Sequence, residues 1–241
     1  MVLCRPHVLN AQTPAMWEAL RQMGRDLPGD VRVVVVRGEG RAFSAGLDLA
    51  AVSAGESGHD GFSFAEMAER TDADAAAIIA RFQEGFSWLR RADLVSIAAV
   101  RGHAIGAGFQ LALACDLRVL AEDAQLTMAE VSLGLVPDLG GTRRLVELVG
   151  YARALDICIT GRRLGAAEAD RFGLATAVVP NDDLDQAVAE LVAQVLAANR
   201  DAVVEIKALL AAAGTRDFAA QEAAERAAQV RRLRDLVGLG E

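Results

Sequence analysis

The sequence predicts an α/β fold in which buried strands alternate with helices. Two apolar runs have the character of strands buried on both faces, VRVVVVRG (31–38) and LVSIAAVRG (94–102), and a glycine-rich turn follows each of them. An apolar helical run, FQLALACD, comes after the second turn. Strand, glycine turn and helix thus recur at 31–50 and 94–115. This alternation is typical of α/β proteins, whose ligand sites lie where strands end and helices begin.

The other elements of the N-terminal half follow in order. Helical spacing over residues 14–27, after an N-cap threonine and with proline at the first helical position, predicts a helix that leads into the strand at 31–38. Residues 51–75 are polar and rich in glycine, which predicts a mobile connection. Helical periodicity returns over residues 76–92, before the second strand.

Further short strands are predicted at LRVLA (117–121) and ATAVVP (175–180). The remaining C-terminal segments are rich in alanine, which favours helices. A boundary near residue 180 therefore divides the chain into a core of residues 1–180 and a helical region of residues 181–241. The long apolar faces of that region need a packing partner, and another subunit is the expected one.

Composition and charge narrow the class of protein. The chain has 241 residues, a formal net charge of −8, three cysteines and three histidines. No apolar run approaches the ~20 residues of a membrane span, and the first residues lack the apolar core of a signal peptide, so we expect a soluble cytoplasmic protein. The negative charge argues against nucleic-acid binding. The cysteines and histidines lack paired spacing, so we expect free thiols and no metal site.

The two glycine turns favour one kind of anion site over others. A helix that begins at such a turn presents unpaired N–H groups, which suit a phosphate or the oxyanion of a reacting carbonyl. The dinucleotide pattern GxGxxG fails because Phe43 and Leu111 stand where its third glycine would be, and no GK[ST] ending occurs. Ser44 lies in AFSAG rather than GxSxG, which excludes a nucleophile elbow. An oxyanion hole remains, beside the plain alternative of tight turns that only permit close packing.

Three long motifs point to a known family. AFSAGLDL (42–49), VRGHAIGAGFQLALACDLRV (100–119) and AEVSLGLVPDLGGTRRL (129–145) resemble, in order and spacing, the signature of the enoyl-CoA hydratase/isomerase family, the crotonase superfamily. ITGRRLGAAEADRFGLATAVVP (159–180) also resembles a family segment. The resemblance covers most of residues 5–180.

The resemblance implies a crotonase-like spiral of ββα units, followed by helices that assemble a homotrimer or a dimer of trimers. It implies an acyl-CoA substrate, with coenzyme A as part of the substrate and no separate cofactor. The enolate of the thioester would be stabilised by the backbone N–H groups of Leu47 and Ala107. Ala45 would lie beside the adenine with Asp48 in the same loop, and Gly106 would border the substrate.

The acidic residues indicate which reaction the enolate undergoes. Hydratases of the family carry two glutamates, whereas this chain has Gln110 at the first position and Glu130 at the second. Glutamine can bind a water by hydrogen bonds but cannot take its proton. Glu130 and Asp138, eight residues apart in AEVSLGLVPD, resemble the glutamate and aspartate of dienoyl-CoA isomerases. We therefore predict a double-bond isomerase with Glu130 as main proton shuttle and Asp138 as second acid/base.

Other interpretations stay open. A hydratase would use Glu130 while Gln110 holds the water, and a noncatalytic member would bind acyl-CoA without proton exchange. A dehalogenase, with its nucleophile at the position of Asp138, is disfavoured because those enzymes have tryptophan where this chain has Glu130. As plain structure, Glu130 would cap a turn, and Asp138 would form an Asx turn to the glycines that follow it.

The chain also departs from the family in several ways. It begins at what resembles the second strand of the family's N-terminal hairpin, and its last residues lack the usual phenylalanine and lysine that reach CoA. Leu47 is bulkier than the usual alanine, which narrows the acyl site. Basic residues such as Arg41 would then contact the CoA phosphates. Four further charged residues are assigned to structure rather than to the substrate: Asp116, Arg118, Arg143 and Arg144.

Overall fold

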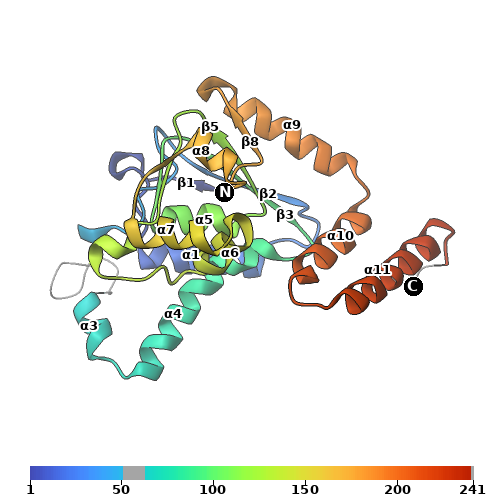
Figure 1. Cartoon of the computed structure of the whole chain (residues 1–241), viewed down its shortest axis with the longest axis horizontal. Coiled ribbons are helices and arrows are strands. Elements are labelled where there is room, and N and C mark those ends of the chain that lie inside the picture. The colour runs from blue at the N-terminus through green and yellow to red at the C-terminus, as the bar shows by residue number, and fades with distance from the viewer. Residues whose placement is uncertain (51–62, 240–241) are drawn as a thin grey trace.

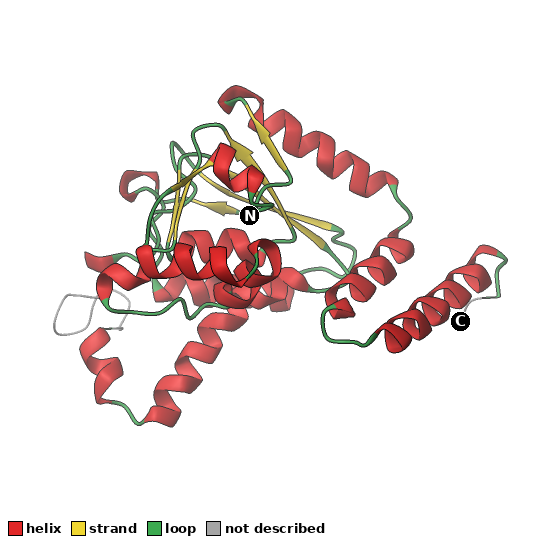
Figure 2. Ribbon diagram, viewed as in Figure 1, coloured by secondary structure: helices red, strands yellow, loops and turns green. Residues whose placement is uncertain are grey.

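A parallel sheet forms the centre of the fold, which the computed structural model describes for residues 1–50 and 63–239. The order of its five strands is β1 (Val2–Leu3), β2 (Val33–Gly38), β3 (Val95–Val100), β5 (Leu117–Ala121) and β8 (Ala177–Val179). A smaller sheet contains β4 (His103–Ile105), β6 (Gln125–Thr127) and β7 (Leu164–Gly165), with β7 antiparallel to β6. Figure 2 shows both sheets enclosed by helices.

The central sheet is covered on both faces because its strands are apolar at successive positions. All six residues of β3 are buried, and successive side chains of a strand point to opposite faces. Val95, Ile97 and Ala99 pack in a cluster with α9 (Leu184–Ala197), whereas Ala98 and Val100 belong to a larger cluster on the other face. The second face is covered by the helices that carry and surround the site.

The larger core cluster includes residues of α1 (Pro14–Asp26), α4 (Asp72–Ser87), α5 (Ala107–Ala114), α6 (Gly141–Val149) and α7 (Tyr151–Thr160). Figure 1 shows α1, α5, α6 and α7 together on one side of the central sheet and α9 on another side. Short helices are η1 (Pro6–Val8), α3 (Phe64–Glu69), η2 (Trp88–Arg90), η3 (Glu130–Leu133), α8 (Ala166–Arg171) and η4 (Asn181–Asp183). The chain continues from α9 into α10 (Arg200–Ala213) and α11 (Phe218–Leu236).

The predicted N-terminal elements are largely confirmed. The Thr13 side chain accepts a hydrogen bond from the Met16 N–H, and Pro14 opens α1 as expected. The strand predicted at 31–38 is β2, with Val34 and Val36 buried. The prediction of a turn over HAIGAG is partly wrong, because its first three residues form the strand β4. Two strands therefore precede α5, namely β3 and β4, and two precede α6, namely β5 and β6, as a ββα spiral requires.

The connection predicted over residues 51–75 is wrong in its second part. Residues 51–62 lie outside the described part of the chain, but α3 and the start of α4 fall within 63–75. Ser63 accepts a hydrogen bond from the Glu66 N–H, and Thr71 accepts one from the Asp74 N–H. These N-caps stabilise helices in a segment whose polar composition favoured a loop.

The C-terminal helices differ in how they meet the core. Leu184 and Val188 of α9 are buried against β3 and β5. The Lys207 ammonium on α10 lies 2.6 Å from an Asp116 carboxylate oxygen, and that oxygen also accepts from the Ser96 N–H. By contrast, Figure 1 shows α11 extending away from the sheet, and Phe218 at its start is exposed. In residues 1–50 and 63–239, no helix is long and apolar enough to cross a bilayer.

Candidate active site

A cavity of about 420 Å³ contains both predicted acids and both predicted oxyanion donors. One part of its wall is made by apolar side chains of α1, α3 and α4, namely Trp17, Phe64, Met67, Ile79 and Phe82. Another part is made by Leu133, Leu135, Val136 and Leu139 in the segment between β6 and α6. The few polar groups therefore lie in an apolar surrounding, as in most small-molecule sites.

The backbone N–H groups of Leu47 and Ala107 are not used by the regular hydrogen bonds of the segments that contain them. Leu47 forms a parallel bridge with Gln12, in which Gly46 O accepts from Gln12 and Asp48 N donates to Gln12. In an extended segment the polar groups of successive residues point in opposite directions, so the Leu47 N–H points to the other side. Ala107 is the first residue of α5, where the N–H has no intrahelical acceptor.

Close approach of two loops brings these donors together. Gly46 has a φ of +85°, and a Cβ at this position would lie 2.4 Å from Ile105 O and 3.5 Å from Ala107 N. Gly108 packs in the same way against Ser44, where a Cβ would lie 2.7 Å from the carbonyl oxygen. Both positions therefore require glycine, and they set the Leu47 loop directly against the start of α5.

A buried hydrogen-bond chain supports the Leu47 loop. The Trp17 indole N–H donates to Gln12 Oε1 at 2.8 Å, and Gln12 Nε2 donates to Ser44 Oγ at 3.0 Å. Ser44 Oγ in turn donates to Asn10 O and accepts from the Gly46 N–H. Sequence reasoning missed this chain, because Gln12 and Ser44 lie 32 positions apart. The sequence signal that could have revealed it is the pair of polar residues Asn10 and Gln12 in RPHVLNAQ, both of which are buried in the structure.

One carboxylate oxygen of Glu130 accepts a hydrogen bond, and the other has no partner among the described residues. The Gln110 side-chain amide donates to Glu130 Oε1 at 2.7 Å, while Glu130 Oε2 is buried and has no hydrogen-bond partner in the described structure. Burial raises the pKa of the Glu130 carboxyl, and the negative charge of Asp138 raises it further. A Cβ on Gly106 would lie 3.3 Å from Glu130 Oε1, so this carboxylate lies against the start of α5.

Asp138 lies in the same cavity as Glu130, and burial raises the pKa of its carboxyl as well. An Asx turn at Asp138 would use backbone N–H groups that follow it in the chain. The N–H groups of Leu139 and Gly141 donate to Gln110 Oε1 instead of to Asp138. The two acids are thus left facing a cavity with raised proton affinity, as acid/base groups need.

The remaining predicted site residues separate into two groups. Ala45, Gly106 and Gln110 line the cavity with the acids. Asp48 is not among the lining residues, and its carboxylate pairs with the Arg5 guanidinium at 2.9 Å. Asp48 therefore ties the N-terminal segment to the Leu47 loop in this structure.

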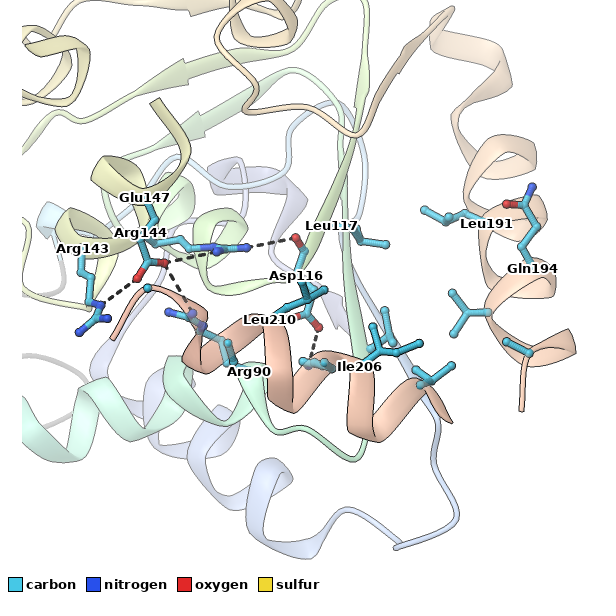
Figure 3. A pocket seen from close by; sticks show the side chains of 17 residues that line it. Arg90, Asp116, Leu117, Arg143, Arg144, Glu147, Leu191, Gln194, Ile206 and Leu210 are labelled. Carbon is cyan, nitrogen blue, oxygen red and sulfur yellow. Dashed lines mark hydrogen bonds and ion pairs between the residues drawn. The ribbon is translucent and has the colours of Figure 1, made fainter. Parts of the chain in front are cut away.

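A second cavity, of about 760 Å³, lies between the central sheet, α6, α9 and α10 (Figure 3). The Glu147 carboxylate on α6 pairs there with Arg143 and lies 3.6 Å from Arg90. Asp116 pairs with Lys207, which connects the sheet to α10. The interactions of Asp116 and Arg143 agree with the structural roles expected for them. Among residues 1–50 and 63–239, no group of three or more His, Cys, Asp or Glu side chains could hold a metal ion.

Comparison with known proteins places the chain in a family. The sequence model of the enoyl-CoA hydratase/isomerase family matches residues 1–234. A Thermobifida fusca protein assigned as an enoyl-CoA hydratase, solved with CoA, is 51% identical and superposes with a TM-score of 0.93 over 98% of this chain and 90% of that chain. The same protein has also been solved with acetoacetyl-CoA. The chain therefore belongs to the enoyl-CoA hydratase/isomerase family and has the crotonase fold, as its motifs predict.

Curated relatives carry more than one activity. A Mycobacterium tuberculosis protein assigned as an enoyl-CoA hydratase is 36% identical over 186 residues, which are 76% of this chain and 66% of that protein. A mitochondrial Δ3,5-Δ2,4-dienoyl-CoA isomerase of Dictyostelium discoideum is 28% identical over 207 residues, 85% of this chain and 69% of that protein. The chain thus spans slightly less than two thirds of the mycobacterial relative, and family membership alone does not define its reaction.

Proposed function

We propose that this protein is an enzyme that moves a double bond along the acyl chain of an enoyl-CoA or dienoyl-CoA. The observation that carries this proposal is the state of the two residues at the positions of the hydratase glutamates. Glu130 has a raised pKa, and one of its carboxylate oxygens has no hydrogen-bond partner among the described residues. Gln110 cannot act as a general acid or base, and its amide oxygen accepts hydrogen bonds from two backbone N–H groups.

The chemistry needs one proton removed and one returned. The thioester oxygen accepts hydrogen bonds from the N–H groups of Leu47 and Ala107, which stabilise the negative charge that forms there. Glu130 removes a proton from the α carbon of a 3-enoyl thioester and gives a dienolate. Return of a proton to the γ carbon completes the shift of the double bond to the 2-position. No water is added or lost.

Asp138 extends the same chemistry to a longer conjugated system. In a 3,5-dienoyl thioester, charge spreads from the oxygen to the far end of the diene. A second acid in the cavity, protonated at a higher pH than an exposed aspartate, supplies the proton at that end while Glu130 acts at the α carbon. The aspartate eight residues after Glu130 supports a dienoyl-CoA as the preferred substrate.

Three substrates distinguish this proposal from its alternatives. The protein is incubated with trans-3-enoyl-CoA, 3,5-dienoyl-CoA and crotonyl-CoA in deuterated water, while the absorbance of the conjugated thioester and deuterium uptake are followed. We expect isomerisation of the first two, with uptake that depends on Glu130. Faster hydration of crotonyl-CoA would establish a hydratase instead. Binding without any uptake would establish a noncatalytic acyl-CoA-binding protein.

We also propose that the helices from residue 181 onward assemble a homotrimer or a dimer of trimers. Large apolar side chains on α10 and α11 remain in contact with solvent in the single chain, among them Ile206, Leu210, Phe218, Leu233 and Leu236. Exposed apolar side chains gathered on neighbouring helices are typical of surfaces that pack against a partner. Light scattering coupled to size exclusion tests this, and a monomer at micromolar concentration would contradict it.

A further inference from the structure

Gln110 makes three hydrogen bonds although it is almost completely buried, with 1% of its surface exposed. It lies on α5, three residues after Ala107, the predicted oxyanion donor. Its Nε2 donates to Glu130 Oε1 at 2.7 Å. Its Oε1 accepts from Leu139 N at 2.9 Å and from Gly141 N at 3.2 Å. One amide thus contacts both the catalytic glutamate and the turn that carries Asp138.

The orientation of this amide follows from its backbone partners. The N–H groups of Leu139 and Gly141 can only donate, so they require the oxygen end of the Gln110 amide. The NH₂ end must then face Glu130, which accepts at Oε1. A flipped amide would place two donors against two donors and oxygen against carboxylate, which is unfavourable at all three contacts.

We infer that Gln110 is a positioning residue that orients the Glu130 carboxylate and fixes the turn of Asp138 relative to it. Its hydrogen bond to Oε1 sets the rotation of the carboxylate, because the other oxygen, Oε2, is buried and has no partner among the described residues. Its amide oxygen accepts from two backbone N–H groups and so holds residues 139–141 next to Glu130. This inference rests on the proposed proton shuttle and gives Gln110 a role different from holding water.

The saturation of the amide oxygen supports this role. A carbonyl oxygen has two lone pairs, and on Gln110 both are engaged by backbone N–H groups. A water bound to Gln110 would have only the second N–H of the amide available. Gly141 makes the contact possible, because a Cβ there would lie 2.8 Å from Gln110 Cγ.

Gln110→Glu is the most informative variant. The introduced carboxylate can still accept from Leu139 N and Gly141 N, so the turn is retained, but when ionised it cannot donate to Glu130. Two carboxyls within hydrogen-bond distance share one proton, so one of their pKa values falls and the other rises. We expect the acidic limb of the kcat profile to move up by about one pH unit or more. KM should change little, since the oxyanion donors are untouched.

Two further variants control for structure and charge. Gln110→Met keeps the length but removes all three contacts, and we expect kcat to fall about 100-fold because both acids lose their position. Gln194→Glu makes the same change of charge on an exposed side chain of α9, which does not line the cavity of the two acids. Its profile should remain close to that of the wild type, since water and salt screen the added charge.

A direct titration separates this inference from the proposed function. Carbon-13 NMR of labelled glutamate side chains, with the Glu130 signal assigned from Glu130→Gln, reports the carboxyl without any substrate. A higher midpoint for the Glu130 signal in Gln110→Glu than in the wild type supports the inference, and an unchanged midpoint and pH profile would overturn it. A wild-type protein that isomerises no enoyl-CoA would refute the proposed function. The titration would still test the contact between Gln110 and Glu130.

Discussion

The two sides of the cavity use different parts of the polypeptide. On the oxyanion side the proposed working groups are the backbone N–H groups of Leu47 and Ala107, held by glycines and a buried hydrogen-bond chain. On the acid side the proposed working groups are the side chains of Glu130 and Asp138, in an apolar segment between β6 and α6. The first side depends on backbone geometry and the second on residue identity. A family can therefore keep the first and change its reaction through the second.

The largest expected effect is on the acid side. Glu130→Gln keeps the shape and can still accept from Gln110, but removes the base. We expect the rate of isomerisation and of α-proton exchange to fall about 1000-fold, within the usual range for general acid/base catalysis. Initial-rate assays with 3-enoyl-CoA, together with deuterium uptake at the α carbon, measure the two rates. Affinity for the CoA thioester should persist, and a variant that retains wild-type turnover would rule out Glu130 as the shuttle.

On the oxyanion side, Gly46→Ala should lower kcat about 100-fold, the loss associated with one oxyanion donor. The added Cβ would meet Ile105 O at 2.4 Å in a left-handed conformation, so the Leu47 N–H must move. Gly29→Ala is the matched control, because a Cβ there meets nothing within 4 Å. Ala107→Pro removes the second donor directly, at a first helical position that tolerates proline. Full activity in both variants would remove these backbone groups from the mechanism.

The difference between the two sides also explains what could be predicted from sequence. The strands at 31–38 and 94–102 are visible because periodicity is local, whereas the acids at 130 and 138 were singled out through the resemblance of their motif to a known family. The chain from Trp17 through Gln12 to Ser44 is not, since it depends on contacts between distant segments. The strand β4 has only three residues and was hidden in a glycine-rich turn. Contacts made by tertiary packing are therefore the part that sequence reasoning missed.

Asp138→Asn tests whether Glu130 and Asp138 act at different carbons of the substrate. We expect dienoyl-CoA isomerisation to fall about 10- to 100-fold, while deuterium exchange at the α carbon changes much less, because Glu130 alone performs that step. Mass spectrometry of the recovered thioester measures both. Asp30→Asn, at an exposed position, is the control for the change of charge. Equal losses of exchange and isomerisation would mean that the two acids do not act at separate carbons.

The pH dependence tests the coupling of the two acids. Glu130 must be ionised to act as a base, and its pKa is raised by burial and by Asp138, so activity should be lost as the pH falls through a value above the ordinary range of glutamate. In Asp138→Asn the repulsion is absent, and the acidic limb should move to lower pH. Initial rates of α-proton exchange across pH 4–8 measure this shift. A limb that stays in place would show that the acids titrate independently.

The smallest expected effect is on stability. A carboxyl whose pKa is raised by folding binds its proton more tightly in the folded state, so its contribution to stability is greatest at low pH and declines as the pH rises through the unfolded and then the folded pKa of Glu130. Glu130→Gln removes this penalty. We expect the variant to be more stable than the wild type by about 1 kcal/mol at pH 8, and equal to it near pH 4. Urea unfolding at the two pH values measures the difference. Equal stability at both values would mean that the buried carboxyl of Glu130 imposes no electrostatic cost on the fold.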